Sequence, residues 1–391
     1  MGARKPSELC LILLFLGILL TVPVVQTSIE LRRGDPLQAL DVFRERPTAA
    51  HLRAYERQLE DESVVAESLR PLAQYARFVW LKDGGDKAII GRNGWLFYGP
   101  GVDYLTRKSN PAKDSTSAEA LSAIVDFRDQ LSAHGIRLVV MPAPNKESIY
   151  PEKLSGGGSI QPGVLSHETR DLMAGLERAQ VPVVNLFELF ANARGTNENE
   201  PLYLPQDSHW SPLGLNLAAT AVAKRLTETT AVAMGTVNFE LRGQTMERVG
   251  DILRMLRLQQ FEKGSASKPI LCEQVLRSDT QEKYRDLVDS QVLVLGDSFL
   301  RIFQQDEPGA AGFVAHLARN LKQPIASIIN DGGASTLVRQ ELNRRPNLLV
   351  NKQVVIWEFV ERDIRVGTLG WQKIRLPEIK RSESAKVALS K

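Results

Sequence analysis

The first hydrophobic pattern along the chain is an uninterrupted apolar run from Leu9 to Val25 that contains no charged residue. The run is short for a membrane-spanning helix and slightly long for the apolar core of a cleaved signal peptide. Arg4 and Lys5 precede it, and the following "VVQTS" is a poor cleavage site. We therefore expect residues 1–27 to be an uncleaved signal anchor, with a cleaved signal peptide as the alternative. Either way, the basic residues stay cytoplasmic and the remaining chain is exported.

The next segment has a helical pattern, with many charges among leucine, alanine and valine from Asp41 to about Leu81. It predicts a helical stalk or small subdomain over residues 28–84. The stretch "IIGRNGWLFYG" follows, in which Asn93-Gly94 is a strong turn signal between two short strand-like pieces.

From residue 85 to 370, helical patterns alternate with continuously apolar runs that are typical of strands buried on both faces. The expected strands are 136–144, 181–186, 291–296, 324–331 and 353–361. The expected helices are centred on Leu121–Leu131, His167–Ala179, Pro212–Leu226 and Phe313–Leu321. This alternation predicts an α/β domain with a mostly parallel sheet and helices on both faces. Residues 227–288 are less regular and are interpreted as an insertion, and residues 371–391 as a flexible tail.

Composition narrows the class of protein. The hydrophobic fraction of 43% is that of a globular chain, and 49 Lys and Arg residues nearly balance 46 Asp and Glu residues. The chain therefore lacks the excess of positive charge that is typical of nucleic-acid-binding proteins. Only Cys272 lies outside the N-terminal run, so no disulfide is expected within the exported part.

Candidate chemistry begins where the apolar run 291–296 ends in Gly296-Asp297-Ser298. Sites in parallel α/β sheets form beyond the carboxyl ends of the strands. Ser298 falls there, one step before an expected helix, where backbone N–H groups can stabilise an oxyanion. A serine hydroxyl is a weak nucleophile and needs a base. The segment is not the G-x-S-x-G elbow of α/β-hydrolases, because Leu300 occupies the position of the second glycine.

The base is expected among five histidines. His209 is the one in a loop segment with an acidic residue, Asp207, two positions earlier. A carboxylate at this spacing can accept from one ring nitrogen, which fixes the tautomer and leaves the other nitrogen free as a base. No further metal ligands occur at nearby spacing, so no metal is expected. Together the motifs predict a Ser298–His209–Asp207 triad, although each motif alone is also explained by an ordinary turn.

At this point the residues resemble the AlgJ/AlgX family of exopolysaccharide O-acetylation proteins, a permuted branch of the SGNH-hydrolase superfamily. The similarity rests on "DSHWSPLG" followed much later by "VLVLGDSF". It extends to "GRNGWLFYG", "MPAPNKESIYPE", "GDILRML" and "VVIWEFVERDI", and so covers about residues 85 to 365. The chain shows no room for the carbohydrate-binding module of AlgX, so it looks closer to the AlgJ branch.

The resemblance implies an SGNH-like domain in the periplasm, tethered to the inner membrane, that moves acetyl groups onto alginate or a similar polysaccharide. It assigns Ser298 as nucleophile, His209 as base and Asp207 as the residue that orients it. It also implies an acetyl donor supplied by a membrane-bound acyltransferase partner, and no cofactor. Further candidates, equally explicable as structural residues, are the oxyanion donors Ser298, Asn330, Gly332 and Gly333 and the substrate-lining Lys146, Tyr150 and Trp210.

Three alternatives remain open from the residues alone. A carbohydrate acetylesterase would differ from a transferase in using water as acceptor. A non-catalytic scaffold would bind the polymer or partner proteins through the same fold. A glycoside-cleaving carboxylate pair among Glu358, Glu361 and Asp363 is disfavoured, because acids at strand ends are usually solvated or paired, here with Arg362.

Overall fold

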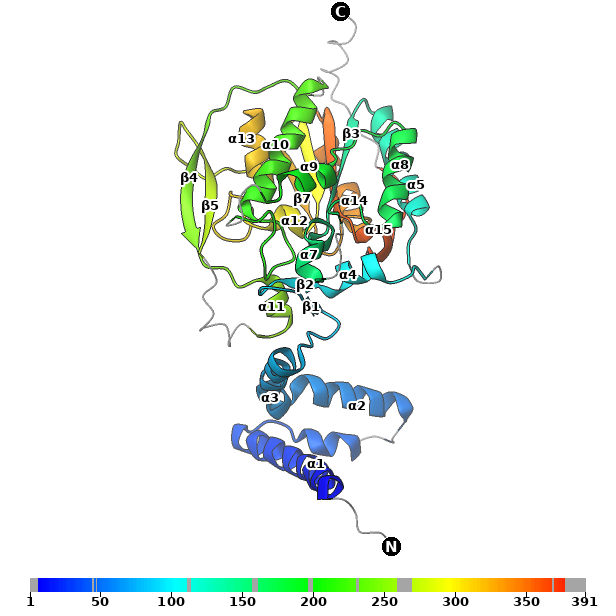
Figure 1. Ribbon diagram of the computed structural model, residues 1–391, viewed down its shortest axis with the longest axis vertical. Coiled ribbons are helices and arrows are strands. Elements are labelled where there is room, and N and C mark those ends of the chain that lie inside the picture. The colour runs from blue at the N-terminus through cyan, green and yellow to red at the C-terminus, as the bar shows by residue number, and fades with distance from the viewer. Residues whose placement is uncertain are drawn as a thin grey trace, which may run out of the picture. The chain divides into compact units, whose positions relative to one another are not determined.

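The computed structural model describes residues 6–376, except 44–45, 47, 111–113, 157–160, 196–199, 230–231, 259–268 and 368. The chain divides into two compact units (Figure 1). The first comprises residues 1–82 and 256–261, and the second comprises residues 83–255 and 262–391.

The first unit is helical. Its elements are α1 (Pro6–Arg33), η1 (Gln38–Phe43), α2 (Ala49–Glu62), α3 (Val64–Ala76) and the π-helical turn η2 (Arg77–Leu81). In the described part of the chain, α1 alone is long and apolar enough to cross a membrane. This confirms the expected N-terminal apolar helix, which fits a signal sequence or an anchor.

A four-stranded parallel sheet forms the centre of the second unit, in the order β3-β8-β6-β7. Its strands are β3 (Arg137–Ala143), β8 (Val354–Val360), β6 (Val292–Gly296) and β7 (Ala326–Ile329). Successive side chains of each strand enter opposite hydrophobic cores, as a period of two requires. Both faces are therefore buried, which explains the continuously apolar runs and confirms the predicted α/β class.

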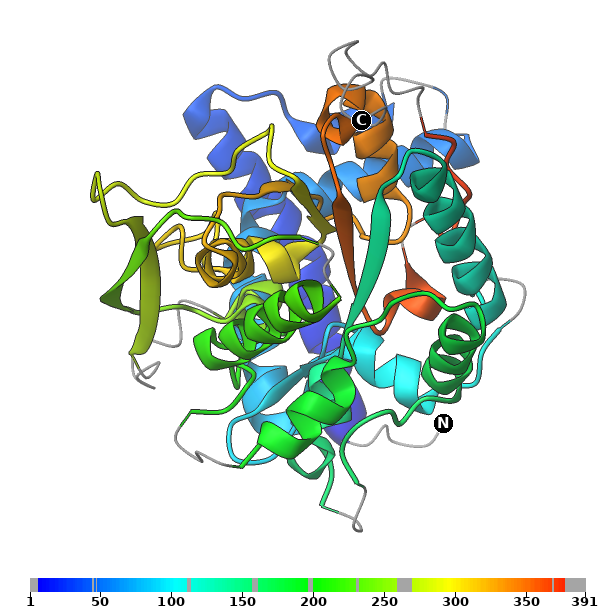
Figure 2. The same ribbon diagram turned by 90° about the horizontal axis from the view of Figure 1, so that it is seen from above.

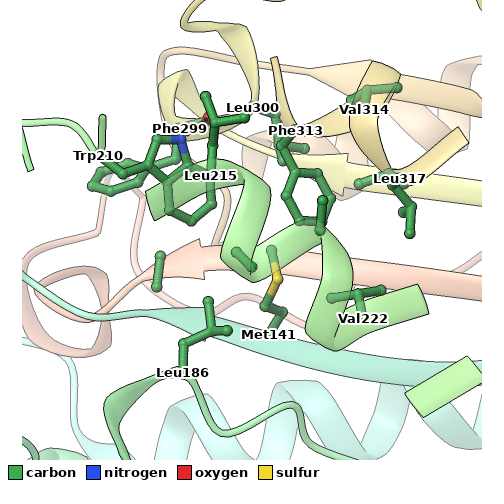
Figure 3. Close-up of a cluster of buried hydrophobic side chains, with 14 of the residues drawn as sticks. Met141, Leu186, Trp210, Leu215, Val222, Phe299, Leu300, Phe313, Val314 and Leu317 are labelled. Atoms are coloured by element: carbon green, nitrogen blue, oxygen red, sulfur yellow. Dashed lines mark hydrogen bonds between the residues drawn. The ribbon is translucent and has the colours of Figure 1, made fainter. Parts of the chain in front are cut away.

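Helices cover both faces of this sheet (Figure 2). One core holds side chains of α9 (Leu186–Ala193), α10 (Pro212–Glu228) and α13 (Phe313–Leu321). The other holds those of α5 (Ser117–Ala133), α8 (His167–Arg178), α14 (Leu337–Arg344) and α15 (Asp363–Val366). In the first core, Trp210 and Phe299 pack beside Phe313 (Figure 3). Trp210 follows His209 and Phe299 follows Ser298, so this packing holds both motifs against one hydrophobic cluster.

Short elements complete the second unit. The predicted turn at Asn93-Gly94 joins β1 (Ala88–Ile90) to β2 (Leu96–Tyr98), an antiparallel pair, and both turn residues have positive φ. The remaining elements are α4 (Gly99–Thr106), α6 (Lys146–Ile149), α7 (Pro151–Leu154), β4 (Phe239–Met246), α11 (Asp251–Met255), β5 (Ile270–Arg277), α12 (Ser298–Arg301) and η3 (Pro346–Leu349).

The structure differs from three sequence expectations. The expected strand 181–186 makes only an isolated bridge between Val183 and Val140, because Pro182 lacks an N–H and Asn185 already caps α9. The insertion 227–288 is more regular than expected, since β4 and β5 form an antiparallel pair with α11 between them. The start of the expected flexible tail is ordered instead, because Trp371 packs on the sheet and its Nε1 donates to the Asp363 carbonyl at 2.8 Å.

Candidate active site

Ser298 lies at the carboxyl end of β6 and is the first residue of α12. The Asp297 carboxylate caps this helix by accepting from the Phe299 N–H at 2.9 Å. The Asp297 N–H donates to Glu358 Oε2 of the neighbouring strand at 3.0 Å. A Cβ at Gly296 would lie 2.4 Å from the same Glu358 oxygen, so a larger residue there would displace the Glu358 carboxylate. These contacts hold the serine, which is partly exposed, at the edge of the sheet.

His209 lies in the loop that leads into α10, which Ser211 caps. Its Nε2 is 2.8 Å from Ser298 Oγ, and its Nδ1 is 2.6 Å from Asp207 Oδ1. The Asp207 carboxylate accepts from Nδ1–H, so Nε2 carries a free lone pair toward the serine hydroxyl. The structure thus brings together the three residues that the sequence nominated, although 89 positions separate Ser298 from His209.

Four donors converge on the buried Asp207 carboxylate. Oδ1 accepts from the His209 ring and from the His209 backbone N–H at 3.1 Å. Oδ2 accepts from Arg248 Nε at 3.0 Å and from the Asp251 N–H at 3.1 Å. Arg248 in turn pairs with Asp306 at 3.2 Å. Both Arg248 and Asp251 come from the insertion, so this segment completes the surroundings of the candidate triad.

The electrostatics of this group favour a charged aspartate beside a basic imidazole. Burial opposes charge on Asp207, but His209 and Arg248 outweigh it and hold the pKa of that carboxyl well below its usual range. Burial alone would lower the pKa of His209, but the Asp207 carboxylate outweighs it and the pKa is raised above 6.5. The neighbouring carboxylate therefore strengthens the ring nitrogen as a base.

Asp207, His209 and Asp251 also form a group whose ligand atoms lie within 4.8 Å of one another, as in a metal site. Asp251 is already engaged, because its oxygens accept from the Ser208 N–H at 2.7 Å and the Ser208 hydroxyl at 2.5 Å. Asp207 is also engaged, because its Oδ1 accepts from the His209 ring at 2.6 Å and its Oδ2 accepts from Arg248 Nε at 3.0 Å. The donor set is therefore better suited to orienting an imidazole than to holding an ion.

The expected substrate-lining residues lie in the interior instead, where they hold loops in place. Lys146 Nζ donates to the carbonyls of Leu204 and Pro205, both at 3.0 Å, and of Asp207 at 2.7 Å. Tyr150 Oη accepts from the Leu202 N–H at 2.9 Å. Trp210 Nε1 donates to the Phe299 carbonyl at 3.0 Å, which ties the histidine loop to the serine helix. All three are buried, so they position the site rather than line it.

The turn "NDGGAST" does not supply the expected oxyanion donors. The Gly332 N–H donates to Asn330 Oδ1 at 2.9 Å, and the Gly333 N–H donates to the Asn330 carbonyl at 3.1 Å. The Asn330 amide donates to Glu341 at 3.2 Å. The two glycine N–H groups are therefore engaged within the turn, and the Asn330 amide is engaged by Glu341 of α14. Ser298 remains as a candidate, because the first N–H groups of a helix have no partner within the helix.

The strand-end acids also differ from the expectation that they are solvated or paired with Arg362. Glu358 and Glu361 are fully buried, and Asp363 is nearly so. Glu361 accepts from the Asn145 N–H at 3.0 Å, Ser148 Oγ at 2.6 Å and Thr169 Oγ1 at 2.8 Å. Burial raises the pKa of both Glu361 and Asp363 to about 7. These acids organise loops under the site, which leaves no exposed carboxylate pair for glycoside cleavage among them.

The family of SGNH hydrolase-like domains of acetyltransferase AlgX matches residues 88–361, which is well over half of the chain. The chain belongs to this family. The match contains the serine, histidine and aspartate described above, and it confirms the resemblance drawn from the motifs.

Two relatives and one solved structure illustrate the range of this AlgX-type family. The probable alginate O-acetylase AlgJ of Pseudomonas aeruginosa is 26% identical over 295 residues, covering 72% of this chain and 71% of the relative. Its counterpart in Pseudomonas fluorescens is 27% identical over 294 residues, covering 73% and 70%. The O-acetyltransferase domain of Pseudomonas putida AlgJ superposes with a TM-score of 0.55 at 22% identity, over 78% of this chain and 99% of that domain. The superposition supports the shared fold.

Turnover should depend on pH through His209. Since its pKa is raised, the ring is protonated and inactive as a base at low pH, and activity should appear as pH rises through a value above 6.5. The measurement is kcat/KM for a chromogenic acetyl ester between about pH 5 and 9, since this ratio reports groups of the free enzyme. An acid limb centred below 6.5 would show that Asp207 does not strengthen the base.

Arg248 should matter for both stability and activity. Arg248→Ala leaves the buried Asp207 carboxylate without its cation, whereas the partly exposed Asp306 keeps Arg301, and breaking a buried pair costs about 3–5 kcal/mol of unfolding free energy. Ester turnover should fall too, because the Asp207 carboxylate is less firmly held. Urea unfolding and ester kinetics measure both effects. Arg254→Ala, an exposed arginine of α11, is the matched control. Equal stability of the two variants would contradict the role of Arg248.

Proposed function

We propose that this protein is an O-acetyltransferase that acts outside the cytoplasmic membrane and moves acetyl groups onto an exopolysaccharide such as alginate. The observation that carries the proposal is the chain of contacts from Asp207 through His209 to Ser298, at 2.6 and 2.8 Å, within an AlgX-type domain. The names of the relatives, alginate O-acetylases, suggest the polymer.

The reaction is a double displacement. His209 Nε2 accepts the Ser298 hydroxyl proton while Oγ attacks the carbonyl carbon of the acetyl donor. The tetrahedral intermediate collapses, the leaving group takes the proton from His209, and acetyl-serine remains. A sugar hydroxyl then attacks this ester and gives its proton to Nε2, and Ser298 leaves as the free hydroxyl. Asp207 stays ionised and stabilises the imidazolium in both steps.

The exported position follows from the apolar helix α1, which we propose remains as an anchor in the inner membrane, with the second unit in the periplasm. An acetyl donor has to reach that side of the membrane, so a membrane-bound acyltransferase is the proposed partner. Mass spectrometry of the membrane-extracted protein tests the anchor, since a mature chain beginning near Thr27 or Ser28 would show cleavage.

Transfer is tested against hydrolysis by intact-mass analysis with a chromogenic acetyl ester. The protein should gain one acetyl group, mapped to Ser298, and mannuronate oligomers should remove it with the appearance of acetylated oligomers. A neutral glucan oligomer serves as the control acceptor. Acetate as the only product with either acceptor would show an esterase, and acetyl on another residue would refute the assigned nucleophile.

A further inference from the structure

We propose that α3 and η2, residues 64–81, lie in the headgroup region of the inner membrane and contact lipid through an apolar stripe. The stripe consists of Leu69, Leu72, Tyr75, Trp80 and Leu81. Its occupant is the lipid surface of the bilayer that α1 is proposed to cross, so the proposal builds on the anchor and goes beyond the acetyl transfer.

Large apolar side chains of this segment are exposed alongside its charged residues Glu67 and Arg77. Leu69, Leu72 and Tyr75 are 53%, 54% and 41% exposed, and Trp80 and Leu81 are 80% and 71% exposed. Arg70 and Gln74 on the same helix are only partly exposed. A helix of a water-soluble domain turns its apolar residues inward, and a large contiguous apolar surface marks an interaction site. The stripe is therefore a surface that another apolar phase covers.

The contacts within the first unit place the start of α3 at the level of the membrane surface. The side chains of α1 from Glu8 to Val25, the last residue of the apolar run, are exposed or partly exposed, whereas Gln26 and Glu30 are buried among the helices of this unit. Gln26 Oε1 accepts from the N–H of Val64, the first residue of α3, at 3.0 Å. The chain thus leaves the apolar run of α1 at Gln26 and passes through η1 and α2. It returns beside Gln26 where α3 begins.

The chemistry of the segment matches a lipid interface. Tryptophan and tyrosine concentrate where headgroups meet acyl chains, because their rings are apolar and their tips are polar. Three cations, Arg70, Arg77 and Lys82, against one acid, Glu67, give residues 64–82 a positive balance. Anionic lipids attract such a segment, and an amphipathic helix of this kind lies in the plane of the interface.

Trp80 is a built-in probe for the test. The chain has five tryptophans, and the other four, Trp95, Trp210, Trp357 and Trp371, are buried in the second unit. The full-length protein is placed in vesicles of phosphatidylethanolamine and phosphatidylglycerol, and the Trp80→Phe protein supplies the difference spectrum. Trp80 emission should be shifted to the blue, quenched by phospholipids brominated on their acyl chains, and protected from aqueous acrylamide.

Leu72→Glu should weaken quenching of Trp80 by the brominated lipids and increase quenching by acrylamide. Leu213→Glu, at a partly exposed leucine of α10 in the second unit, is the matched control and should change neither. Acrylamide quenching of Trp80 without bromolipid quenching would refute the proposal, as would protection from both quenchers, which would show that protein covers the stripe. Alkaline extraction of the membranes tests the α1 anchor separately, because an anchored protein stays in the membrane. The anchor and the contact of the stripe with lipid can therefore be refuted independently.

Discussion

Ser298→Ala should abolish release of acetyl from a model ester and acetylation of the polymer. The hydroxyl oxygen is the atom that forms and breaks the acetyl bond, and the structure places it 2.8 Å from the base. In a triad, loss of the nucleophile costs about 10⁶-fold in kcat, and removing a second member adds little. Ser298→Ala, His209→Ala and the double variant should therefore have similar residual rates in ester hydrolysis.

Folding should survive the Ser298 substitution, because the hydroxyl is partly exposed and water can replace its bond to His209. Ser132→Ala, at an exposed serine of α5, is the control for the substitution type and should keep wild-type turnover. Thermal unfolding should separate loss of chemistry from loss of fold. Normal polymer acetylation by Ser298→Ala protein in cells would favour the scaffold alternative.

Local sequence patterns were sufficient to predict the candidate site residues that lie within short motifs. An apolar strand followed by Gly296-Asp297-Ser298 marks a strand end in a parallel sheet, and the Asp207–His209 spacing indicates an oriented imidazole. That Ser298 and His209 lie close together in space is predicted only from their chemical roles, because a nucleophilic serine needs a base. The structure shows what brings the two residues together: Trp210, which directly follows His209, donates from Nε1 to the Phe299 carbonyl of α12, the helix that begins at Ser298.

Arg248 and Asp251 were missed as site residues because their contacts are long-range. They lie 41 and 44 positions from Asp207, in a segment without clear periodicity, and nothing in their spacing points to it. The weak signal was "GDILRML", which contains Asp251 and matched the family pattern. For Lys146, Tyr150 and Trp210 the sequence left a substrate-lining and a structural role equally open, because it does not show whether a polar side chain faces substrate or a neighbouring carbonyl.

Asp207→Asn should be nearly as damaging to turnover as loss of His209, through the orientation of the ring. The carboxylate receives four donors, two on each oxygen, and has none to give. An asparagine amide places an NH₂ group where one oxygen stood. Facing His209, the NH₂ group would force the proton onto Nε2, and the ring could no longer accept from Ser298. In a related triad, this tautomer costs about 10⁴-fold in kcat.

The other orientation of the amide is no better for the protein. Its NH₂ group would then face Arg248 Nε and the Asp251 N–H, so two buried donors would lose their acceptor, in addition to the loss of negative charge beside Arg248 that both orientations share. Breaking such a buried pair costs about 3–5 kcal/mol. Asp207→Asn should therefore lose stability in both orientations, more in the second, and should lose turnover through the wrong tautomer in the first. The ¹⁵N shifts of the His209 ring, read beside urea unfolding, distinguish the two. Turnover and stability that both equal wild type would mean that Asp207 neither orients the imidazole nor balances Arg248.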